Sequence, residues 1–482
     1  MIALLLSLQS FAAPAEIGGY FRVMTRPDLQ GGAGRLGFWN LYGRLLNEGP
    51  YATLDFRFQL LERSTSQEPW TSLHTRIEGA SIGNADEQNG NLSQLRLSQT
   101  YVLAGNVLIP DVIWQVGTLD TYFGDLGLYD MRPAQIFFET VGLSARYQKP
   151  NYELLVGFGD SGYAIKGTNY NTIPTVGGTA RMRPINGLEI GVGGQFRWES
   201  GIKGNQAAPY NTPGLEYEDY IRGEFTQGFF DENPTETLIF PFPELRDAQS
   251  STIIGYLGFG GFGPVIWNNF YARYEHHHPL GPTTELFQGD TYTIYATDLT
   301  DERTTLTIGN EMQLRVIPNR FDITWAALYG DSKDADNDIL ASEGNRTYMS
   351  TVVRGQVYMT DHLHLLLEGS AAQEVSKNGN LFREHYDSIF KNTEGTTDSR
   401  GLEYGDTDTR YTFQGKGGIV INPMGKGIFN RPSLRLLYGI QYSNQNNAFG
   451  NRFVETLDQY NDFGNVEQHI HQLIALETEA WF

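Results

Sequence analysis

The chain has 482 residues, no cysteine and a formal net charge of −21, and 13% of its residues are aromatic. The lack of cysteine excludes disulfides and thiolate metal sites, and the acidity argues against a nucleic-acid partner, because binding phosphates needs clustered lysine and arginine. Beyond the first dozen residues, no apolar stretch approaches the roughly 20 residues that a membrane helix needs.

Residues 1–15 (MIALLLSLQSFAAPA) have the features of a secretory signal peptide. An apolar core at residues 2–8 is followed by Ala13 and Ala15, the small residues that a cleavage site after Ala15 requires. The basic residues that usually open such a segment are missing. A strand or buried helix at this end is the alternative prediction.

The next two segments alternate in polarity. In residues 20–23 (YFRV), Tyr20 and Arg22 share one face of an extended strand. Residues 39–45 (WNLYGRL) predict a second strand, in which Tyr42 and Arg44 share a face opposite the apolar side chains of Trp39, Leu41 and Leu45.

Residues 51–60 (YATLDFRFQL) carry the clearest alternation. Asp55 and Arg57 fall on one face with Thr53 and Gln59, and the other face is formed by Leu54, Phe56, Phe58 and Leu60. A soluble sandwich can also alternate, but a polar face with charged side chains suits a water-filled lumen, and the apolar face suits lipid.

The same pattern recurs along most of the chain. Leu95, Leu97 and Tyr101 alternate with Gln94, Arg96 and Ser98, and residues 433–442 alternate in the same way. We count about 18 such runs of about 10 residues, the length of a tilted barrel strand in a bilayer. Open strand edges are not tolerated in lipid, so we expect a closed all-β structure, a transmembrane antiparallel β-barrel.

Connections of two lengths support this architecture. Short turns are predicted at residues 149–152, 183–187, 317–320 and 359–362, and long polar connections near 64–92, 200–250, 331–345 and 375–408. Barrels of the outer membrane have short periplasmic turns and long outer loops. With no domain boundary in sight, residues 16–482 are expected to form a single outer-membrane barrel domain after the signal peptide at 1–15.

The last residues, 469–482 (HIHQLIALETEAWF), also alternate. The even positions from Ile470 to Phe482 are mostly apolar and are expected to face lipid, which places odd-numbered Trp481 on the lumenal face. A final aromatic residue after such a run resembles the terminal strand of outer-membrane barrels.

Several motifs together resemble the maltoporin family of carbohydrate-selective porins. Residues 429–442 (FNRPSLRLLYGIQY) resemble the family's aromatic-x-R-P-x-hydrophobic-R strand, and the ending E-x-E-A-W-F is similar to the family's last strand. Tyr20-Phe21-Arg22 resembles the Y-x-R of the first strand. Arg35-Leu36-Gly37 followed by Tyr42 resembles the R-L-G strand that carries a lumenal tyrosine. These matches cover about a tenth of the chain.

The resemblance implies a row of lumenal aromatic rings on which sugars slide, flanked by charged side chains. By alternation, the rings expected on the lumenal side are Tyr20, Tyr42, Phe429 and Trp481. The charged track would be formed by Arg22, Arg44, Asp55, Arg57 and Arg435. A pyranose offers an apolar C–H face to rings and a rim of hydroxyls to charges. The alternative is that these rings only pack beneath inward-folded loops.

One residue departs from the family pattern. Where the family places an acid two residues after the tyrosine of the second strand, this chain has Arg44, so the preferred sugar could differ.

The family's third loop folds into the barrel and narrows it. Residues 119–139 (LDTYFGDLGLYDMRPAQIFFE) occupy the corresponding interval, and the candidates to line the constriction are Tyr122, Asp125, Asp130 and Arg132. An exposed outer loop is the alternative.

No cofactor or metal site is predicted. Three adjacent histidines, residues 276–278, point in alternate directions on a strand and cannot act on one face. Asp334, Asp336 and Asp338 match the start of an EF-hand loop, but Ile339 and Asn345 stand where glycine and glutamate are needed. This leaves room for only a loosely bound Ca²⁺ on an outer loop.

The leading hypothesis is therefore a channel for passive diffusion of maltodextrin-like oligosaccharides in the outer membrane of a Gram-negative bacterium, and not an enzyme. The expected partners are oligosaccharide solutes, outer-membrane lipid and lipopolysaccharide; the resemblance implies a homotrimer, and no nucleic acid is expected. The alternatives are a porin for general or other solutes, a structural or adhesive barrel, and a barrel enzyme. For the enzyme, the only candidate cluster on one face is His469, His471, Glu477 and Glu479.

Overall fold

The computed structural model describes residues 14–29, 36–37, 39–63, 65–79, 95–138, 140–161, 172–199, 248–277, 283–287, 290–294, 303–334, 346–376, 409–444 and 469–482. Most of the expected signal peptide lies outside these residues, as do Arg35, His278, and the acidic residues Asp336 and Asp338.

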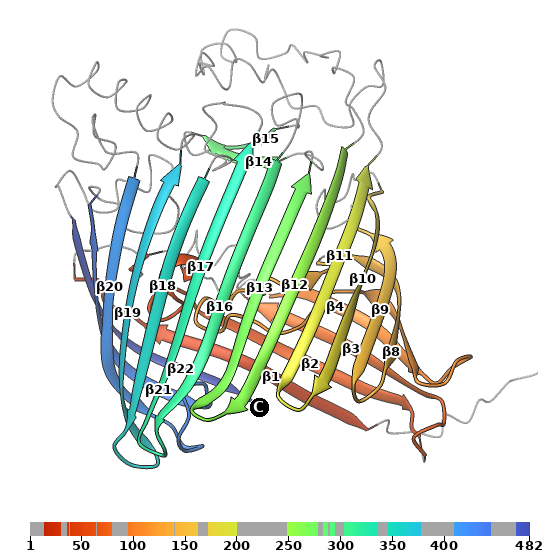
Figure 1. The fold of residues 1–482 in the computed structure, drawn as a ribbon, viewed down its shortest axis with the longest axis horizontal. Coiled ribbons are helices and arrows are strands. Elements are labelled where there is room, and N and C mark those ends of the chain that lie inside the picture. Colours follow the sequence, from red (N-terminus) through yellow and green to blue (C-terminus); the bar gives the residue numbers. More distant parts are fainter. Residues whose placement is uncertain are drawn as a thin grey trace, which may run out of the picture.

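Within the described residues, 18 antiparallel strands form one sheet that closes where β22 pairs with β1 (Figure 1). The predicted fold class is confirmed. The barrel strands are β1 (Ala15–Thr25), β2 (Tyr51–Leu61), β3 (Trp70–Gly79), β4 (Leu95–Gly105), β5 (Val112–Thr118), β8 (Val141–Gln148), β9 (Tyr152–Asp160), β10 (Pro174–Ile185), β11 (Leu188–Glu199), β12 (Ala248–Phe262), β13 (Val265–His277), β16 (Arg303–Ile317), β17 (Phe321–Asp334), β18 (Arg346–Tyr358), β19 (Leu363–Ser376), β20 (Thr409–Ile421), β21 (Ser433–Ser443) and β22 (Ile470–Trp481).

Five further elements lie in the connections. They are the helix α1 (Trp39–Tyr42) and the short strands β6 (Thr121–Tyr122), β7 (Gln135–Ile136), β14 (Thr283–Phe287) and β15 (Asp290–Ile294). Among all residues that the structure describes, no helix is long and apolar enough to cross a membrane.

Side chains alternate between the two faces of the sheet, as the sequence predicts. Along β21, each residue from Leu434 to Tyr442 at an even position is exposed on the outward face, and the residues between them are buried. In β22, Ile474 and Leu476 face outward, whereas Glu477 and Glu479 are buried inside. The strands therefore separate an apolar outer surface from a polar lumen.

The four predicted short turns join strands at one end of the barrel. They connect β8 to β9, β10 to β11, β16 to β17, and β18 to β19. In the β10–β11 turn, Gly187 has φ +80°, a backbone conformation that side chains disfavour. This turn end corresponds to the periplasmic side of outer-membrane barrels.

A β-bulge in β4 reverses the face that the sequence predicted for Tyr101. The pairing jumps from Arg76↔Gln99 to Ile77↔Leu97, so Ser98 is an extra residue. Leu97 faces outward as expected, but Tyr101 pairs with His74 and faces the lumen. Sequence alternation assigned Tyr101 to the lipid face because it could not include the added residue.

Two predicted segments also differ from the structure. Residues 39–42 form the short helix α1 instead of a second strand, because the chain folds inward after β1 and pairs with it again only at β2. Residues 70–79, placed in a long connection between 64 and 92, form strand β3, whose outward and lumenal side chains are mixed in polarity.

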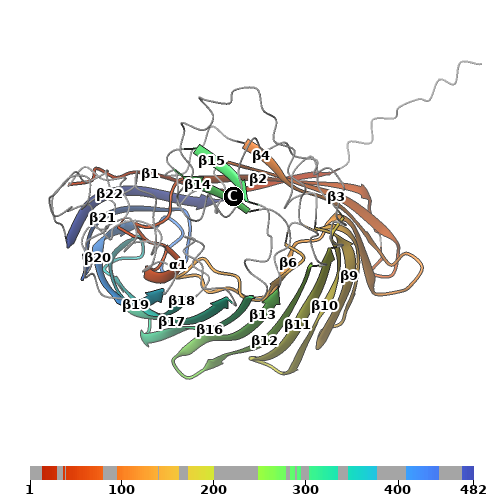
Figure 2. The same cartoon turned by 90° about the horizontal axis from the view of Figure 1, so that it is seen from above.

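Two connections fold into the barrel and form its internal core. We call the described residues between 26 and 50 loop 1 and those between 119 and 140 loop 3; α1 and β6 lie inside the ring of strands (Figure 2). Leu36, Leu45 and Leu46 of loop 1 pack with residues of β19–β22. Leu126, Leu128 and Tyr129 of loop 3 pack with side chains of β12, β13, β17 and β18. The lumen is therefore partly filled by the chain itself.

The two faces of β5 provide a test of the membrane orientation. Val116 is 57% exposed on the outward face, and the neighbouring Gln115 points into the lumen. Val116→Arg should lower the free energy of unfolding in lipid vesicles by about 2–4 kcal/mol, since it places a charge in lipid. Gln115→Arg is the matched control and should lower the free energy of unfolding much less. Denaturant titration measures the free energy of unfolding of both variants. Equal costs for the two variants would contradict the assignment.

Candidate functional site

A chain of hydrogen bonds crosses the lumen from one wall to the other. On β16, Glu311 Oε2 accepts a hydrogen bond from the Leu128 N–H of loop 3 (2.8 Å). The Leu128 carbonyl in turn accepts one from the Arg44 N–H of loop 1 (2.8 Å). The Arg44 guanidinium then donates to Glu479 Oε1 on β22 (3.1 Å) and to the Tyr20 hydroxyl on β1 (3.0 Å). We call Glu311, Leu128, Arg44 and Glu479 the crossbar.

On one side of the crossbar the polar wall is covered by the inward loops. Glu368 accepts hydrogen bonds from Arg354 (2.6 Å) and Lys416 (2.9 Å), and these side chains are at most 2% exposed. The Tyr42 ring is 2% exposed, and its hydroxyl donates to Glu374 (2.6 Å). Buried charges persist there because each is paired and hydrogen-bonded.

On the other side, charged groups of β2 and β3 are accessible. Asp55 and Arg76 form an ion pair (2.6 Å) with side chains 43% and 33% exposed, and the Arg57 side chain is 44% exposed. Tyr122 of loop 3 is 45% exposed, and the Arg132 guanidinium lies 4.3 Å from the centre of its ring. The accessible part of the lumen is thus bordered by the β2–β3 wall and by loop 3.

Three aromatic rings form a row on adjacent strands at this side. The centre of the Tyr20 ring lies 6.1 Å from that of Trp481 and 5.9 Å from that of Tyr51. The hydroxyls of Tyr20 and Tyr51 donate to Glu479 (2.8 Å) and Glu78 (2.9 Å). These bonds fix the orientation of the two rings. We call Trp481, Tyr20 and Tyr51 the aromatic row.

The structure brings together two of the four rings that the sequence predicted for the slide, Tyr20 and Trp481. Tyr42 belongs to loop 1, and its ring is buried against Tyr348 and Ala372 of the barrel wall. Phe429 lies in the connection between β20 and β21, at the turn end, with its ring centre 6.1 Å from that of Trp267 and against Gly127 of loop 3.

The predicted charged track is divided by the crossbar. Arg22 bonds Glu48 and the Gly49 carbonyl, and Arg435 bonds Glu479; both arginines are buried, and Arg44 is in the crossbar itself. Only Asp55 and Arg57 reach the accessible side. The buried arginines therefore hold the loops, and the exposed pair remains available to a solute.

Loop 3 lies inside the barrel, as the resemblance implied. Its Gly124 has φ +62°, and a side chain there would meet the Tyr271 hydroxyl, so glycine permits the close packing of loop and wall. Asp120 accepts hydrogen bonds from Gln99 (3.1 Å) and Gln135 (2.6 Å). Burial raises the pKa of Asp120 against the opposing effects of these bonds and of Arg132 and Arg76. Of the four constriction candidates, Tyr122 and Asp125 are exposed, and Asp130 and Arg132 are half-buried.

Sequence reasoning missed three residues of the accessible wall: Tyr51, His74 and Tyr101. The rings of His74 and Tyr101 stack with centres 4.9 Å apart. A signal for Tyr51 was present, because its odd position shares a face with Asp55 and Arg57. Tyr101 was concealed by the bulge in β4.

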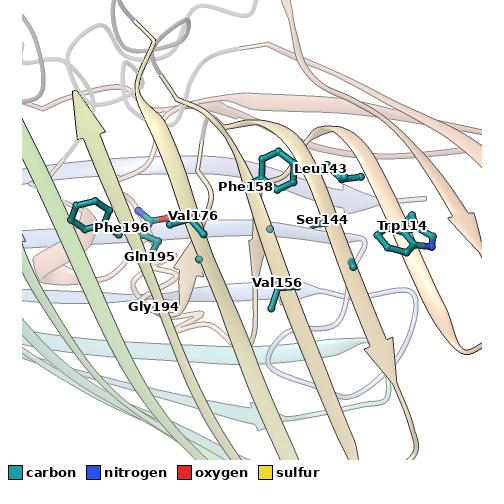
Figure 3. Close-up of a pocket in the computed structure, with 12 residues that line it drawn as sticks. Trp114, Leu143, Ser144, Val156, Phe158, Val176, Gly194, Gln195 and Phe196 are labelled. Carbon is teal, nitrogen blue, oxygen red and sulfur yellow. The ribbon is translucent and has the colours of Figure 1, made fainter. Parts of the chain in front are cut away.

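One hollow lies on the outer surface of the barrel and is not part of the lumen. A depression of about 520 Å³ crosses β5 and β8–β11 and is lined by outward-facing Trp114, Val156, Phe158, Val176 and Phe196 (Figure 3). Its lining is almost entirely apolar. Such a surface suits lipid chains and not a hydrated solute.

The candidate enzyme cluster does not assemble. His471 Nε2 bonds Asp28 (2.7 Å), and His469 Nδ1 bonds the Ser443 carbonyl (3.0 Å). Glu477 pairs with Arg26, and Glu479 with Arg431 and Arg435. Arginines thus neutralise both acids. Among the described residues, no group of three or more histidines or acids could hold a metal ion.

Comparison with known proteins gives one family match. Residues 252–482 match the model of the LamB porin family. No curated protein sequence matches the chain. Among solved structures, the chain is similar to Wzi of Escherichia coli (10% identity, 96% of this chain and 84% of that chain, TM-score 0.40), OccD3 of Pseudomonas aeruginosa (10%, 97% and 91%, 0.40) and OccAB2 of Acinetobacter baumannii (8%, 98% and 98%, 0.42). At these values the structural likenesses carry no inference about function.

The crossbar predicts a role for Glu311 in fixing loop 3. Glu311→Ala leaves the buried Leu128 N–H without its acceptor, at a cost of about 1–3 kcal/mol, and should release the loop. We expect a higher and noisier single-channel conductance in planar bilayers. Glu311→Gln keeps an acceptor oxygen, so its single-channel conductance should be close to that of the parent protein. An alanine variant with the parent's conductance would show that loop 3 is held by other contacts.

Proposed function

We propose that this outer-membrane porin of LamB type, from a Gram-negative bacterium, is a channel for passive diffusion of maltodextrin-like oligosaccharides. The family match and the closed barrel support a porin channel. The observation that carries the sugar proposal is the aromatic row of Trp481, Tyr20 and Tyr51 on the lumenal face.

A row of rings favours sugars over other hydrated solutes. Each ring can bury the apolar C–H face of one pyranose, a contact similar in kind to the stacking of aromatic side chains. Consecutive rings about 6 Å apart give a chain of sugars successive, similar sites. Several weak and similar sites allow a solute both to enter and to leave, which passive transport requires.

Charged groups next to the row supply partners for sugar hydroxyls. The Asp55–Arg76 pair is accessible on the wall beside the row, with side chains 43% and 33% exposed. A sugar hydroxyl can donate a hydrogen bond to a carboxylate and accept one from a guanidinium group, so the pair offers partners for both. In this proposal Asp55 and Arg57 form the charged track, and the Tyr122–Arg132 stack narrows the passage.

The lumenal tyrosine of the second strand is assigned here to Tyr51 in place of Tyr42. Thr53 then stands two residues after it, where the family has an acid. This departure supports a preference that differs in detail from that of the family. The homotrimer, the contact with lipopolysaccharide and the signal peptide at residues 1–15 remain predictions.

The first test measures sugar block. The purified protein in planar bilayers should conduct ions, and added maltodextrin should reduce the current saturably, since a solute bound in the lumen excludes ions. Sucrose and a neutral polymer of similar size are the controls for selectivity. A current that no sugar reduces would favour the alternative of a porin for general or other solutes.

The second test concerns the aromatic row. Tyr51→Leu removes one stacking surface and should raise the half-blocking maltodextrin concentration about 2- to 12-fold, the equivalent of about 0.5–1.5 kcal/mol. Tyr51→Phe keeps the ring and should change the half-blocking concentration less. Tyr42→Phe, at a buried ring, is the matched control and should leave sugar block unchanged. Equal effects of Tyr51→Leu and Tyr42→Phe would exclude a role for the row.

A further inference from the structure

The turn that joins β4 to β5 presents two apolar side chains at the turn end of the barrel. In residues 106–111 (NVLIPD), which we call the apolar turn, Leu108 is 91% exposed and Ile109 is 50% exposed. Leu108 has φ +66°, a backbone conformation that bulky side chains rarely adopt. In water, both the exposure of this leucine and its backbone conformation are unfavourable.

Hydrogen bonds fix the shape of the apolar turn. The Asn106 N–H donates to the Val112 carbonyl (2.9 Å), and the Asn106 side-chain oxygen accepts from the Asp111 N–H (2.9 Å). The Asn106 amide group also donates to the carbonyls of Ser66 (2.9 Å) and Glu68 (3.1 Å) in the connection between β2 and β3. The exposed leucine is therefore held in place by a framework of paired polar groups.

The apolar turn lies on the outward side of β5. Trp114 is one of the outward-facing residues around the hollow in Figure 3, and its indole N–H donates to the Val107 carbonyl of the turn (2.9 Å). Val112 is on the same face of β5 as Trp114 and Val116, yet it is 7% exposed, whereas Val116 is 57% exposed. Both observations place the turn beside the lipid-facing surface and not over the mouth of the lumen.

The neighbouring strands have the features of a membrane interface. Val112 pairs with Tyr147, next to the short turn between β8 and β9, and the Tyr147 ring centre lies 5.9 Å from that of Tyr152. Tyr147 also pairs with Leu154, which is 47% exposed on the outward face. Outer-membrane barrels have aromatic residues at both membrane–water interfaces. These two tyrosines therefore mark the periplasmic interface beside the apolar turn.

A cation lies next to the two rings. Lys149 Nζ is 5.6 Å from the centre of the Tyr147 ring and donates to Asp111 Oδ2 of the apolar turn (2.5 Å). The Lys149 side chain is 35% exposed, and an ammonium group has three N–H donors, so one bond to Asp111 leaves it able to contact a phosphate. Lys149 thus provides a positive group at the depth of the phospholipid headgroups.

We propose that the apolar turn is a lipid anchor: Leu108 and Ile109 insert among the acyl chains of phospholipids in the periplasmic leaflet, with Lys149 at the level of the headgroup phosphates. Insertion removes the apolar surface of Leu108 from water, which offsets its unfavourable backbone conformation. Continuity with the lipid-facing surface of β5 and β8, and the adjacent cation, favour a phospholipid over a second copy of this chain as the occupant. The inference depends on the outer-membrane location of the barrel and not on sugar transport.

The first test locates the apolar turn relative to the membrane. The chain has no cysteine, so Leu108→Cys gives the whole protein a single site for a nitroxide spin label. In vesicles of phosphatidylethanolamine and phosphatidylglycerol, this label should collide more often with oxygen, which is concentrated in lipid, than with a water-soluble nickel complex. Asn319→Cys is the matched control, because Asn319 is exposed in the β16–β17 turn with φ +62°; its label should show the reverse preference.

Two results of this measurement would overturn the anchor. One is a label at residue 108 that meets the nickel complex as often as the label at residue 319 does, which would place the turn in water. The other is a label at residue 108 that is shielded from both reagents, which would show that a second copy of the chain covers the turn.

The second test uses a substitution with opposite effects in water and in lipid. Asparagine adopts a positive φ more readily than leucine, so Leu108→Asn in contact with water should be at least as stable as the parent protein. In lipid the amide group is unfavourable, so we expect the midpoint of unfolding in the same vesicles to shift to a lower denaturant concentration. Leu108→Met keeps an apolar side chain and should unfold close to the parent's midpoint. A midpoint of Leu108→Asn equal to or above that of the parent contradicts insertion.

Discussion

Closure of the sheet by hydrogen bonds between β22 and β1 is the constraint on which the rest of this protein depends. In lipid, every backbone N–H and carbonyl must be paired within the protein, so an open edge is excluded. Once the sheet is closed, alternation becomes a division between inside and outside. Leu436 then meets lipid, and its neighbour Arg435 meets Glu479 in the lumen. Sorting of solutes can occur only on that inner face.

The polar lumen also explains why so much charge is buried. Lumenal walls carry groups such as Glu368 and Lys416 because a barrel interior is wet, and the inward loops then cover part of them. The crossbar from Glu311 to Glu479 fixes the positions of loops 1 and 3 across the lumen. It leaves the aromatic row and the exposed pair of Asp55 and Arg76 bordering the passage. The accessible part of the lumen thus depends on one set of contacts.

Local irregularities account for the site residues that sequence reasoning placed wrongly or missed. Alternation assumes an unbroken strand, so the extra residue Ser98 reversed the face expected for Tyr101. The helix at residues 39–42 had no strong signal of its own, and Tyr42 was given the role that the geometry supports for Tyr51. The family match lies in residues 252–482, beyond these segments, so it could not correct them.

The sequence by itself determined the fold class, the approximate number of strands, and the faces of regular strands such as β2, β21 and β22. These depend on a repeat of two residues, which is a local property of the chain. Only the tertiary structure decided which lumenal residues are accessible. That depends on where loops 1 and 3 pack, and their packing is fixed by contacts such as Glu311 with Leu128, whose partners lie 183 residues apart in the chain. No local pattern records a contact of that kind.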